Sequence, residues 1–332
     1  MFEIYRKSIF PLILIFGFAI LLYSREAEIS TIVTNDPSVH NYAIYTKDGD
    51  ILYADKINST KKILRNTVVL KIDDATIINP IGIIENPPEK SIMDIANMAL
   101  TSLEKDRKVL IIYIDGLGFE LYEKALKLNI VPYLSSLNKG VNAITTFPPI
   151  TDVTFASMVT GVTPKHTGIH NRDKKPMPVP TIFEIAAQMG KTSKLIEGDM
   201  RILIGDFETI LNIDENNDGY IDDEIYRCAL EEMKNPPDLL LVHFHSYDDM
   251  AHLHGPNSDI VLNQLSVLDG YTADIVKNYK GDIIITSDHG MHDEGSGGHH
   301  GIFCAEDIFI PVIKATTGRP YGAEEFLGEK DS

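Results

Sequence analysis

Three short, mostly apolar runs, at 109–114, 239–244 and 283–286, constrain the fold of this chain more than any other feature. Runs of this length without polar alternation are typical of strands that are buried on both faces of a sheet. Helical periodicity lies between them, at 120–128 and 260–279. This alternation predicts an α/β domain in which a mostly parallel central sheet is sandwiched by helices.

The 332 residues divide into three expected parts. Residues 105–332 are expected to form the α/β domain. Residues 31–104 are expected to be a linker and a small β-rich region, in which Asp48-Gly49 is the turn of a hairpin. Residues 1–30 are expected to contain a transmembrane or signal segment.

The N-terminal segment carries an uncharged, mostly apolar run from Ile9 to Tyr23, preceded by Arg6 and Lys7. A basic flank on the N-terminal side favours an orientation in which the rest of the chain is extracytoplasmic. The run is shorter than the roughly 20 residues of a full membrane span. We therefore expect a signal anchor that holds the protein to the membrane, with secretion after cleavage of a signal peptide as the alternative.

Composition excludes some functions. The net charge of −18 disfavours binding of nucleic acid polymers, and an anionic substrate would require bound cations to offset that charge. Two cysteines, Cys228 and Cys304, do not make a disulfide framework or a thiolate metal site. The oligomeric state leaves no signal in the sequence.

Each of the three predicted strands leads to a carboxylate, namely Asp115, Asp248 and Asp288. The carboxyl ends of parallel strands meet at one edge of a sheet, where functional sites gather. Eight of the eleven histidines fall between His243 and His300. Carboxylate and imidazole together are typical ligands of divalent metals, so the sequence predicts a metal site at this edge.

A nucleophile candidate lies between the strands, at Thr151 or Thr154. Metal coordination lowers the pKa of a hydroxyl and makes it nucleophilic. Threonines before a helix also serve as N-caps, which is the alternative interpretation of both residues.

The ordered motifs resemble the type I phosphodiesterase/nucleotide pyrophosphatase branch of the alkaline phosphatase superfamily over roughly residues 108–315. The motifs that carry the resemblance are Ile112-Tyr113-Ile114-Asp115-Gly116, Phe147-Pro148-x-x-Thr151, Val159-Thr160-Gly161, Pro164-x-His166-x-Gly168-Ile169-x-Asn171, Asp248-x-x-x-His252-x-x-Gly255-Pro256, Ser287-Asp288-His289-Gly290-Met291 and His300-Gly301. The resemblance implies an alkaline-phosphatase-like fold and hydrolysis of phosphodiester or pyrophosphate bonds in a small phosphorylated or nucleotide-like substrate.

The resemblance also implies two divalent metal ions, typically zinc, and a threonine nucleophile. One metal would be held by Asp115, Asp288, His289 and Thr151, and the other by Asp248, His252 and His300. Thr151 would attack phosphorus, and water would then hydrolyse the phosphothreonine. Asn171 corresponds to an asparagine that donates to a phosphate oxygen in this family, with a plain loop residue as the alternative.

One stretch departs from the family pattern. Diesterases of the family usually show Thr-Phe-Pro-Asn at the nucleophile, whereas this chain has Thr151-Asp152-Val153-Thr154. The negative charge of Asp152 is expected to disfavour a doubly charged monoester. Other reactions of the superfamily stay open as alternatives, namely phosphomonoester hydrolysis, phosphonate hydrolysis and phospho-group transfer.

A second cation motif lies in residues 214–222. It matches the first nine positions of a calcium-binding loop, with candidate ligands Asp214, Asn216, Asp218, Tyr220 and Asp222. The bidentate glutamate expected at the twelfth position is replaced by Ile225. One structural Ca²⁺ is thus a candidate, and a solvated acidic turn is the alternative. Besides phosphodiester hydrolysis and the other reactions of the superfamily, a third candidate function is that of a non-catalytic, membrane-tethered calcium-binding module.

Overall fold

The computed structural model describes residues 30–33, 41–57, 59–63, 67–72, 75–78 and 80–317. They form two compact units, one of residues 30–47 and 51–87 and one of residues 48–50 and 88–317. The apolar run at 9–23 lies outside the described residues, so the membrane segment stays a prediction. Among the described residues, no helix combines the length and apolar character needed to cross a bilayer.

The smaller unit consists of two sheets. The four-stranded sheet has the order β1 (Ser30–Val33), β7 (Gly82–Glu85), β2 (Tyr42–Tyr45), β3 (Ile51–Ala54). The three-stranded sheet has the order β4 (Ser59–Ile63), β5 (Thr67–Ile72), β6 (Ala75–Ile78). The predicted hairpin is confirmed, because β2 and β3 pair antiparallel on either side of Asp48-Gly49.

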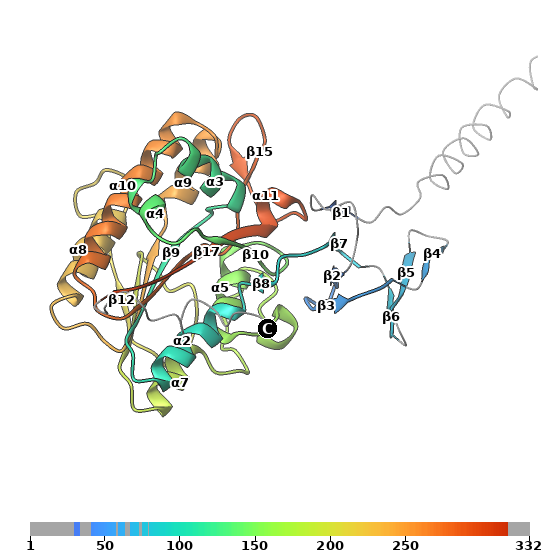
Figure 1. Cartoon of the computed structure of the whole chain (residues 1–332), viewed down its shortest axis with the longest axis horizontal. Coiled ribbons are helices and arrows are strands. Elements are labelled where there is room, and N and C mark those ends of the chain that lie inside the picture. The colour runs from blue at the N-terminus through green and yellow to red at the C-terminus, as the bar shows by residue number, and fades with distance from the viewer. Residues whose placement is uncertain are drawn as a thin grey trace, which may run out of the picture. The chain divides into compact units, whose positions relative to one another are not determined.

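The larger unit contains an eight-stranded sheet (Figure 1). Its order is β12 (Thr209–Leu211), β11 (Ser193–Glu197), β13 (Leu239–Phe244), β9 (Val109–Ile114), β14 (Asp282–Thr286), β17 (Phe309–Thr316), β10 (Val141–Ile144), β8 (Lys90–Ser91). The three predicted strands are the adjacent β13, β9 and β14, and they pair parallel. Only β17 runs against its neighbours, so the prediction of a mostly parallel sheet is confirmed.

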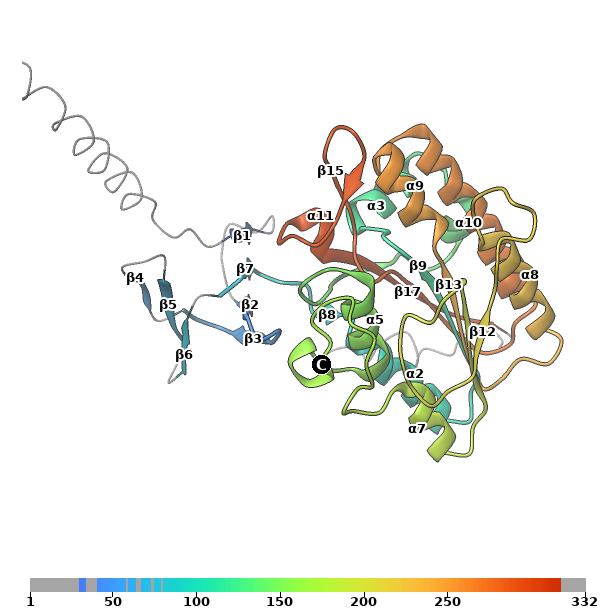
Figure 2. The same cartoon turned by 180° about the vertical axis from the view of Figure 1, so that it is seen from behind.

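Helices cover both faces of this sheet (Figures 1 and 2). One face carries α3 (Phe119–Lys127), α4 (Pro132–Ser136), α8 (Asp222–Glu232), α9 (Ser246–His254) and α10 (Asp259–Lys277). The other carries α2 (Asp94–Glu104), α5 (Thr151–Thr160) and α7 (Ile182–Gln188). Shorter elements complete the unit, namely α6 (Pro164–Thr167), β15 (His292–Asp293), β16 (Gly298–His299) and α11 (Ala305–Ile308).

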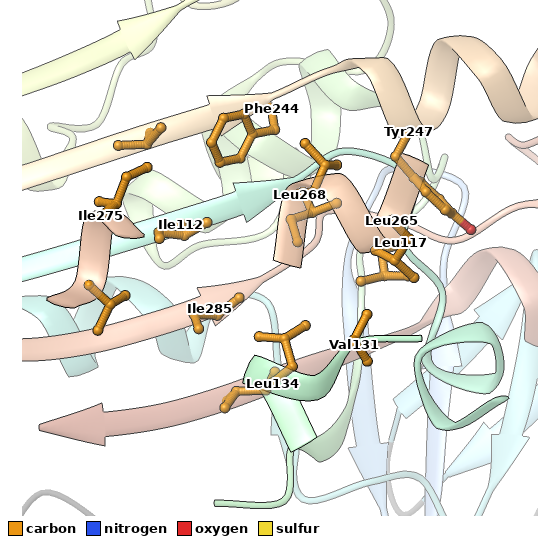
Figure 3. Packing of buried hydrophobic residues seen from close by; sticks show 14 of the residues in the cluster. Ile112, Leu117, Val131, Leu134, Phe244, Tyr247, Leu265, Leu268, Ile275 and Ile285 are labelled. Carbon is orange, nitrogen blue, oxygen red and sulfur yellow. The ribbon is translucent and has the colours of Figure 1, made fainter. Parts of the chain in front are cut away.

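The side chains of β9 alternate between the two hydrophobic clusters, as the period of a strand requires. Ile112 packs on one face, together with Phe244 of β13 and Leu268 of α10 (Figure 3). Tyr113 packs on the opposite face. Burial of each such side chain contributes roughly 1.5–3 kcal/mol. The central strands are therefore held firmly from both sides, and their ends form a rigid base for the residues of the site.

Candidate metal centre

The three predicted carboxylates follow the three central strands. Asp115 comes directly after β9, Asp288 comes two residues after β14, and Asp248 lies in the first turn of α9 after β13. The register aligns the ends of β9 and β13, because Ile114 pairs with Phe244. All three carboxylates are buried.

A glycine permits this close approach. Gly116 has a φ of +76°, and a Cβ atom there would lie 2.6 Å from Oδ1 of Asp248. Its amide also donates to Oδ1 of Asp288 at 3.3 Å. A larger residue at this position would collide with the carboxylate of Asp248, which explains the Asp-Gly sequence at the end of β9.

The three predicted histidine ligands share one arrangement. The Nδ1 atoms lie 2.8–3.0 Å from backbone carbonyl oxygens, His252 with Gly298, His289 with Gly290 and His300 with Pro149. A carbonyl oxygen only accepts, so each Nδ1 carries the hydrogen and each Nε2 presents a lone pair. Backbone bonds of this kind fix the orientation of metal-binding histidines.

The Nε2 atoms face the carboxylates. His289 lies 3.2 Å from Oδ2 of Asp288 and 3.5 Å from Oδ1 of Asp115, and His252 lies 3.3 Å from Oδ2 of Asp248. Among the described residues, four groups have potential ligand atoms within 4.8 Å of one another, and two of them consist of predicted ligands: Asp115, Asp288 and His289, and Asp248, His289 and His300. These two groups share His289, and the sixth predicted ligand, His252, lies beside Asp248, so the structure brings all six into one region.

The electrostatics of the carboxylates fit bound cations. Burial, with the charges of Asp288 and Asp248 adding to it, raises the pKa of Asp115 well above its usual range. Within the described chain, Oδ1 of Asp115 and Oδ1 of Asp248 are buried without a hydrogen-bond partner. A divalent metal would supply the missing partner and keep Asp115 ionised.

The histidines respond to the same environment. Burial and the neighbouring His289 lower the pKa of His300 to about 4, so at neutral pH His300 is the neutral imidazole that metals bind. For Asp248, burial opposes ionisation, but the neighbouring His252, His289 and His300 outweigh it and lower the pKa of its carboxyl to about 2.

Two threonines lie beside this centre, on α5. Oγ1 of Thr151 lies 3.5 Å from Nε2 of His289. Oγ1 of Thr154 instead donates at 3.0 Å to Oδ2 of Asp288 and at 2.9 Å to the carbonyl of Ile150. Thr154 therefore supports a metal-binding carboxylate, while Thr151 is the hydroxyl that faces the ring nitrogen.

Asp152 is paired, contrary to the sequence argument about its charge. Its carboxylate is buried and accepts from Nζ of Lys174 at 2.8 Å, and Lys174 also donates to the carbonyl of Ile202. The expectation that Asp152 would repel a monoester rested on an unpaired charge. Because Lys174 offsets that charge locally, this reason for excluding monoesters no longer holds.

Asn171 lies apart from these contacts. Its side chain is exposed, and its Oδ1 accepts from the amide of Asp173 at 2.9 Å. Within the part of the chain that the structure describes, no hydrogen bond joins it to the aspartates and histidines of the centre.

Most of the candidate calcium loop is exposed, and of its residues Asp222 is buried. The carboxylate of Asp214 accepts from the loop amides of Asn217 at 2.6 Å and Gly219 at 2.9 Å. Asp222 differs from the rest, because it is buried and accepts from the amides of His245 at 2.8 Å and Ser246 at 3.0 Å. Asp222 thus caps the start of α9, the helix that carries Asp248. Calcium binding by this loop stays a prediction.

Sequence reasoning missed three residues behind the centre: Glu197, His243 and His245. Nε2 of His243 lies 3.2 Å from Oδ2 of Asp115, and Nε2 of His245 lies 2.6 Å from Oε1 of Glu197. The available signal was a histidine inside an otherwise apolar strand, β13. Glu197 gave no comparable signal, because a single acidic residue at the end of a strand is common.

Comparison with solved structures gives low-identity matches to part of the chain. A phosphonoacetate hydrolase from Sinorhizobium meliloti 1021, in complex with phosphonoformate, is 15% identical with a TM-score of 0.46, covering 56% of each chain. Human ectonucleotide pyrophosphatase/phosphodiesterase 5 is 22% identical with a TM-score of 0.43, covering 56% of this chain and 57% of that one. The match thus spans little more than half of either relative. No curated protein matches the chain.

The family comparison is more extensive. The model of the type I phosphodiesterase/nucleotide pyrophosphatase family matches residues 109–177 and 200–317. These segments contain β9, β13 and β14, all three carboxylates that follow them, and the three histidines with fixed Nδ1 atoms. The chain belongs to the type I phosphodiesterase/nucleotide pyrophosphatase family of hydrolases, within the alkaline phosphatase superfamily.

Proposed function

We propose that this protein is a two-metal phosphoester hydrolase in which Thr151 is the nucleophile. The observation that carries the proposal is the meeting of the two aspartate–histidine groups at His289, with Oγ1 of Thr151 only 3.5 Å from Nε2 of that residue. Two adjacent cation sites beside one hydroxyl are what an in-line displacement at phosphorus requires.

The ligands divide between two zinc ions. Asp115, Asp288, His289 and the Thr151 hydroxyl would hold one ion, and Asp248, His252 and His300 would hold the other. When bound, the ions lower the pKa of the hydroxyl and offset charge on the phosphoryl and leaving-group oxygens. The protein supplies the geometry, because the strand ends, Gly116 and three backbone carbonyls fix the ligands.

The chemistry proceeds through two displacements. Oγ1 of Thr151 forms a bond to phosphorus while the bond from phosphorus to the leaving oxygen breaks, which gives a phosphothreonine. Water then attacks phosphorus, and the Thr151 oxygen leaves. Thr151 is the first residue of the ten-residue α5, so the phosphoryl group lies at the positive end of that helix.

The proposed substrate class is a phosphodiester or pyrophosphate in a small or nucleotide-like molecule. A second candidate, hydrolysis of phosphomonoesters or phosphonates, is favoured by the pairing of Asp152 with Lys174. That pair replaces an unpaired negative charge beside Thr151 with an ion pair that tolerates a more highly charged substrate.

A panel of aryl phosphate monoesters, aryl phosphate diesters and aryl phosphonates separates these candidates. We expect the purified protein to contain two metal ions per chain and to have its highest kcat/KM on a diester. A higher kcat/KM on the monoester would assign the second candidate. A metal-free protein that hydrolyses none of the panel would contradict both.

A further inference from the structure

His243 occupies an unusual place for a histidine, inside the central strand β13 and completely buried. Its ring stacks on Tyr113 of the neighbouring strand β9, with ring centroids 3.8 Å apart and planes 6° apart. This stacking leaves the ring little freedom to rotate. Its two nitrogens therefore point in directions that the sheet itself determines.

Each ring nitrogen faces a carboxylate. Nε2 lies 3.2 Å from Oδ2 of Asp115, and Nδ1 lies 2.9 Å from Oε1 and 3.1 Å from Oε2 of Glu197. Carboxylate oxygens thus lie on both sides of the ring, and a hydrogen on Nε2 donates to Oδ2 of Asp115. Glu197 is itself fully buried, and its Oε1 also lies 2.6 Å from Nε2 of His245.

The contact with His243 makes the two carboxylate oxygens of Asp115 different. One of its oxygens, Oδ2, is engaged by His243, while Oδ1 has no hydrogen-bond partner in the described chain and lies 3.5 Å from Nε2 of His289. The two oxygens of this carboxylate therefore have different roles. Oδ1 faces the histidine of the metal centre, and Oδ2 faces His243.

We propose that His243 is a positioning residue that dedicates Oδ1 of Asp115 to the metal, with Glu197 as its anchor. The proposal rests on the proposed function, in which Asp115 is a metal ligand. Without the bond to His243, the Asp115 carboxylate could rotate, and its ligand oxygen would no longer be fixed before the metal arrives. Mutation of a residue that hydrogen-bonds a metal ligand typically lowers metal affinity or activity by 10–100-fold.

Two variants of one residue test this. His243→Gln keeps an N–H donor near the position of Nε2, towards Asp115, whereas His243→Asn keeps one near Nδ1, towards Glu197. Both variants lose the stacked ring, so they are matched for the loss of packing on Tyr113. Zinc affinity is measured on the full chain by competition with a chromogenic chelator, and melting of the metal-free proteins reports on folding.

We expect zinc affinity within about 3-fold of wild type in His243→Gln and about 10–100-fold weaker in His243→Asn. Equal losses in both variants would overturn the proposal and leave His243 as a packing residue. Unchanged affinity in His243→Asn would also overturn it. So would a third metal in the wild type that both variants lose, because Asp115, His243 and His245 have potential ligand atoms within 4.8 Å of one another and could hold a cation themselves. A wild type that binds no metal would overturn the proposed function as well, so the two failures are distinguishable.

Discussion

The metal centre and the acidic loop at 214–222 are both cation sites suggested by the sequence, yet they are built in different ways. The loop draws its candidate ligands from nine consecutive residues, and most of it is exposed. The metal centre draws its ligands from Asp115 to His300, and most of them are buried.

The carboxylates of the two regions differ in their hydrogen-bond partners. In the loop, Asp214 accepts from backbone amides of its own turn, at 2.6 Å from Asn217 and 2.9 Å from Gly219. In the centre, Oδ1 of Asp115 and Oδ1 of Asp248 are buried without such a partner among the described residues. A buried, unpartnered carboxylate is costly, so we expect the centre to depend on cations far more than the loop does.

Removal of transition metals should give the largest effect and separate the two regions. A chelator that binds zinc much more tightly than calcium is expected to lower phosphoester hydrolysis by about 10⁴-fold, because metals contribute several kcal/mol to stabilising the transition state. Activity should return on addition of Zn²⁺. Full activity in a protein shown by elemental analysis to be metal-free would break the comparison.

Replacing the nucleophile should give the next largest effect. Thr151→Ala is expected to lower kcat by about 10³-fold or more, because the covalent route is lost. Thr160→Ala is the matched control on the same helix, since the Thr160 hydroxyl donates to the carbonyl of Ala156 within α5, and it should stay within about 2-fold of wild type. Similar losses in both variants would indicate damage to α5 and contradict the assignment of Thr151.

Removing one ion pair in each region tests, through the free energy of unfolding, whether burial distinguishes the two regions. Lys174→Met leaves the buried Asp152 unpaired and is expected to reduce the free energy of unfolding by roughly 1–2 kcal/mol. Glu215→Gln removes the exposed pair between this loop residue and Arg227 and should leave the free energy of unfolding nearly unchanged, because solvent screens exposed charges. Urea denaturation measures the free energy of unfolding of both variants. Equal losses would show that burial does not distinguish the regions.

Calcium should give the smallest effect, confined to the loop. With the twelfth-position glutamate missing, we expect a dissociation constant of about 1 mM, so that 5 mM Ca²⁺ would stabilise the protein by about 1 kcal/mol, or 2–4 °C in Tm. The double variant Asp214→Asn/Asp218→Asn should lose this shift and keep its hydrolytic activity. An unchanged wild-type Tm with calcium would favour the solvated turn.

Much of the central fold could be predicted from the sequence. The strands at 109–114 and 239–244 are observed with the predicted bounds. The antiparallel strand β17 was not predicted. Its sequence contains Pro311 and Lys314, which interrupt the apolar pattern that marks a central strand.

The candidate site was predictable to the extent that its residues follow strands. Asp115, Asp248 and Asp288 were identified because each comes after an apolar run. The pairing of Lys174 with Asp152 could not be predicted, since 22 positions and a loop separate them. The capping of α9 by Asp222 could not be predicted either, because the sequence places Asp222 in a calcium-like motif.

The sequence by itself determined which residue types reach the edge of the sheet, because hydrophobic periodicity decides where each central strand ends and therefore which side chains come next. Only the tertiary structure decided which atoms of those residues face one another. The two oxygens of Asp115 are identical in the sequence, yet one faces His289 and the other His243. That difference arises from contacts between strands and loops distant in the chain, which no local pattern encodes.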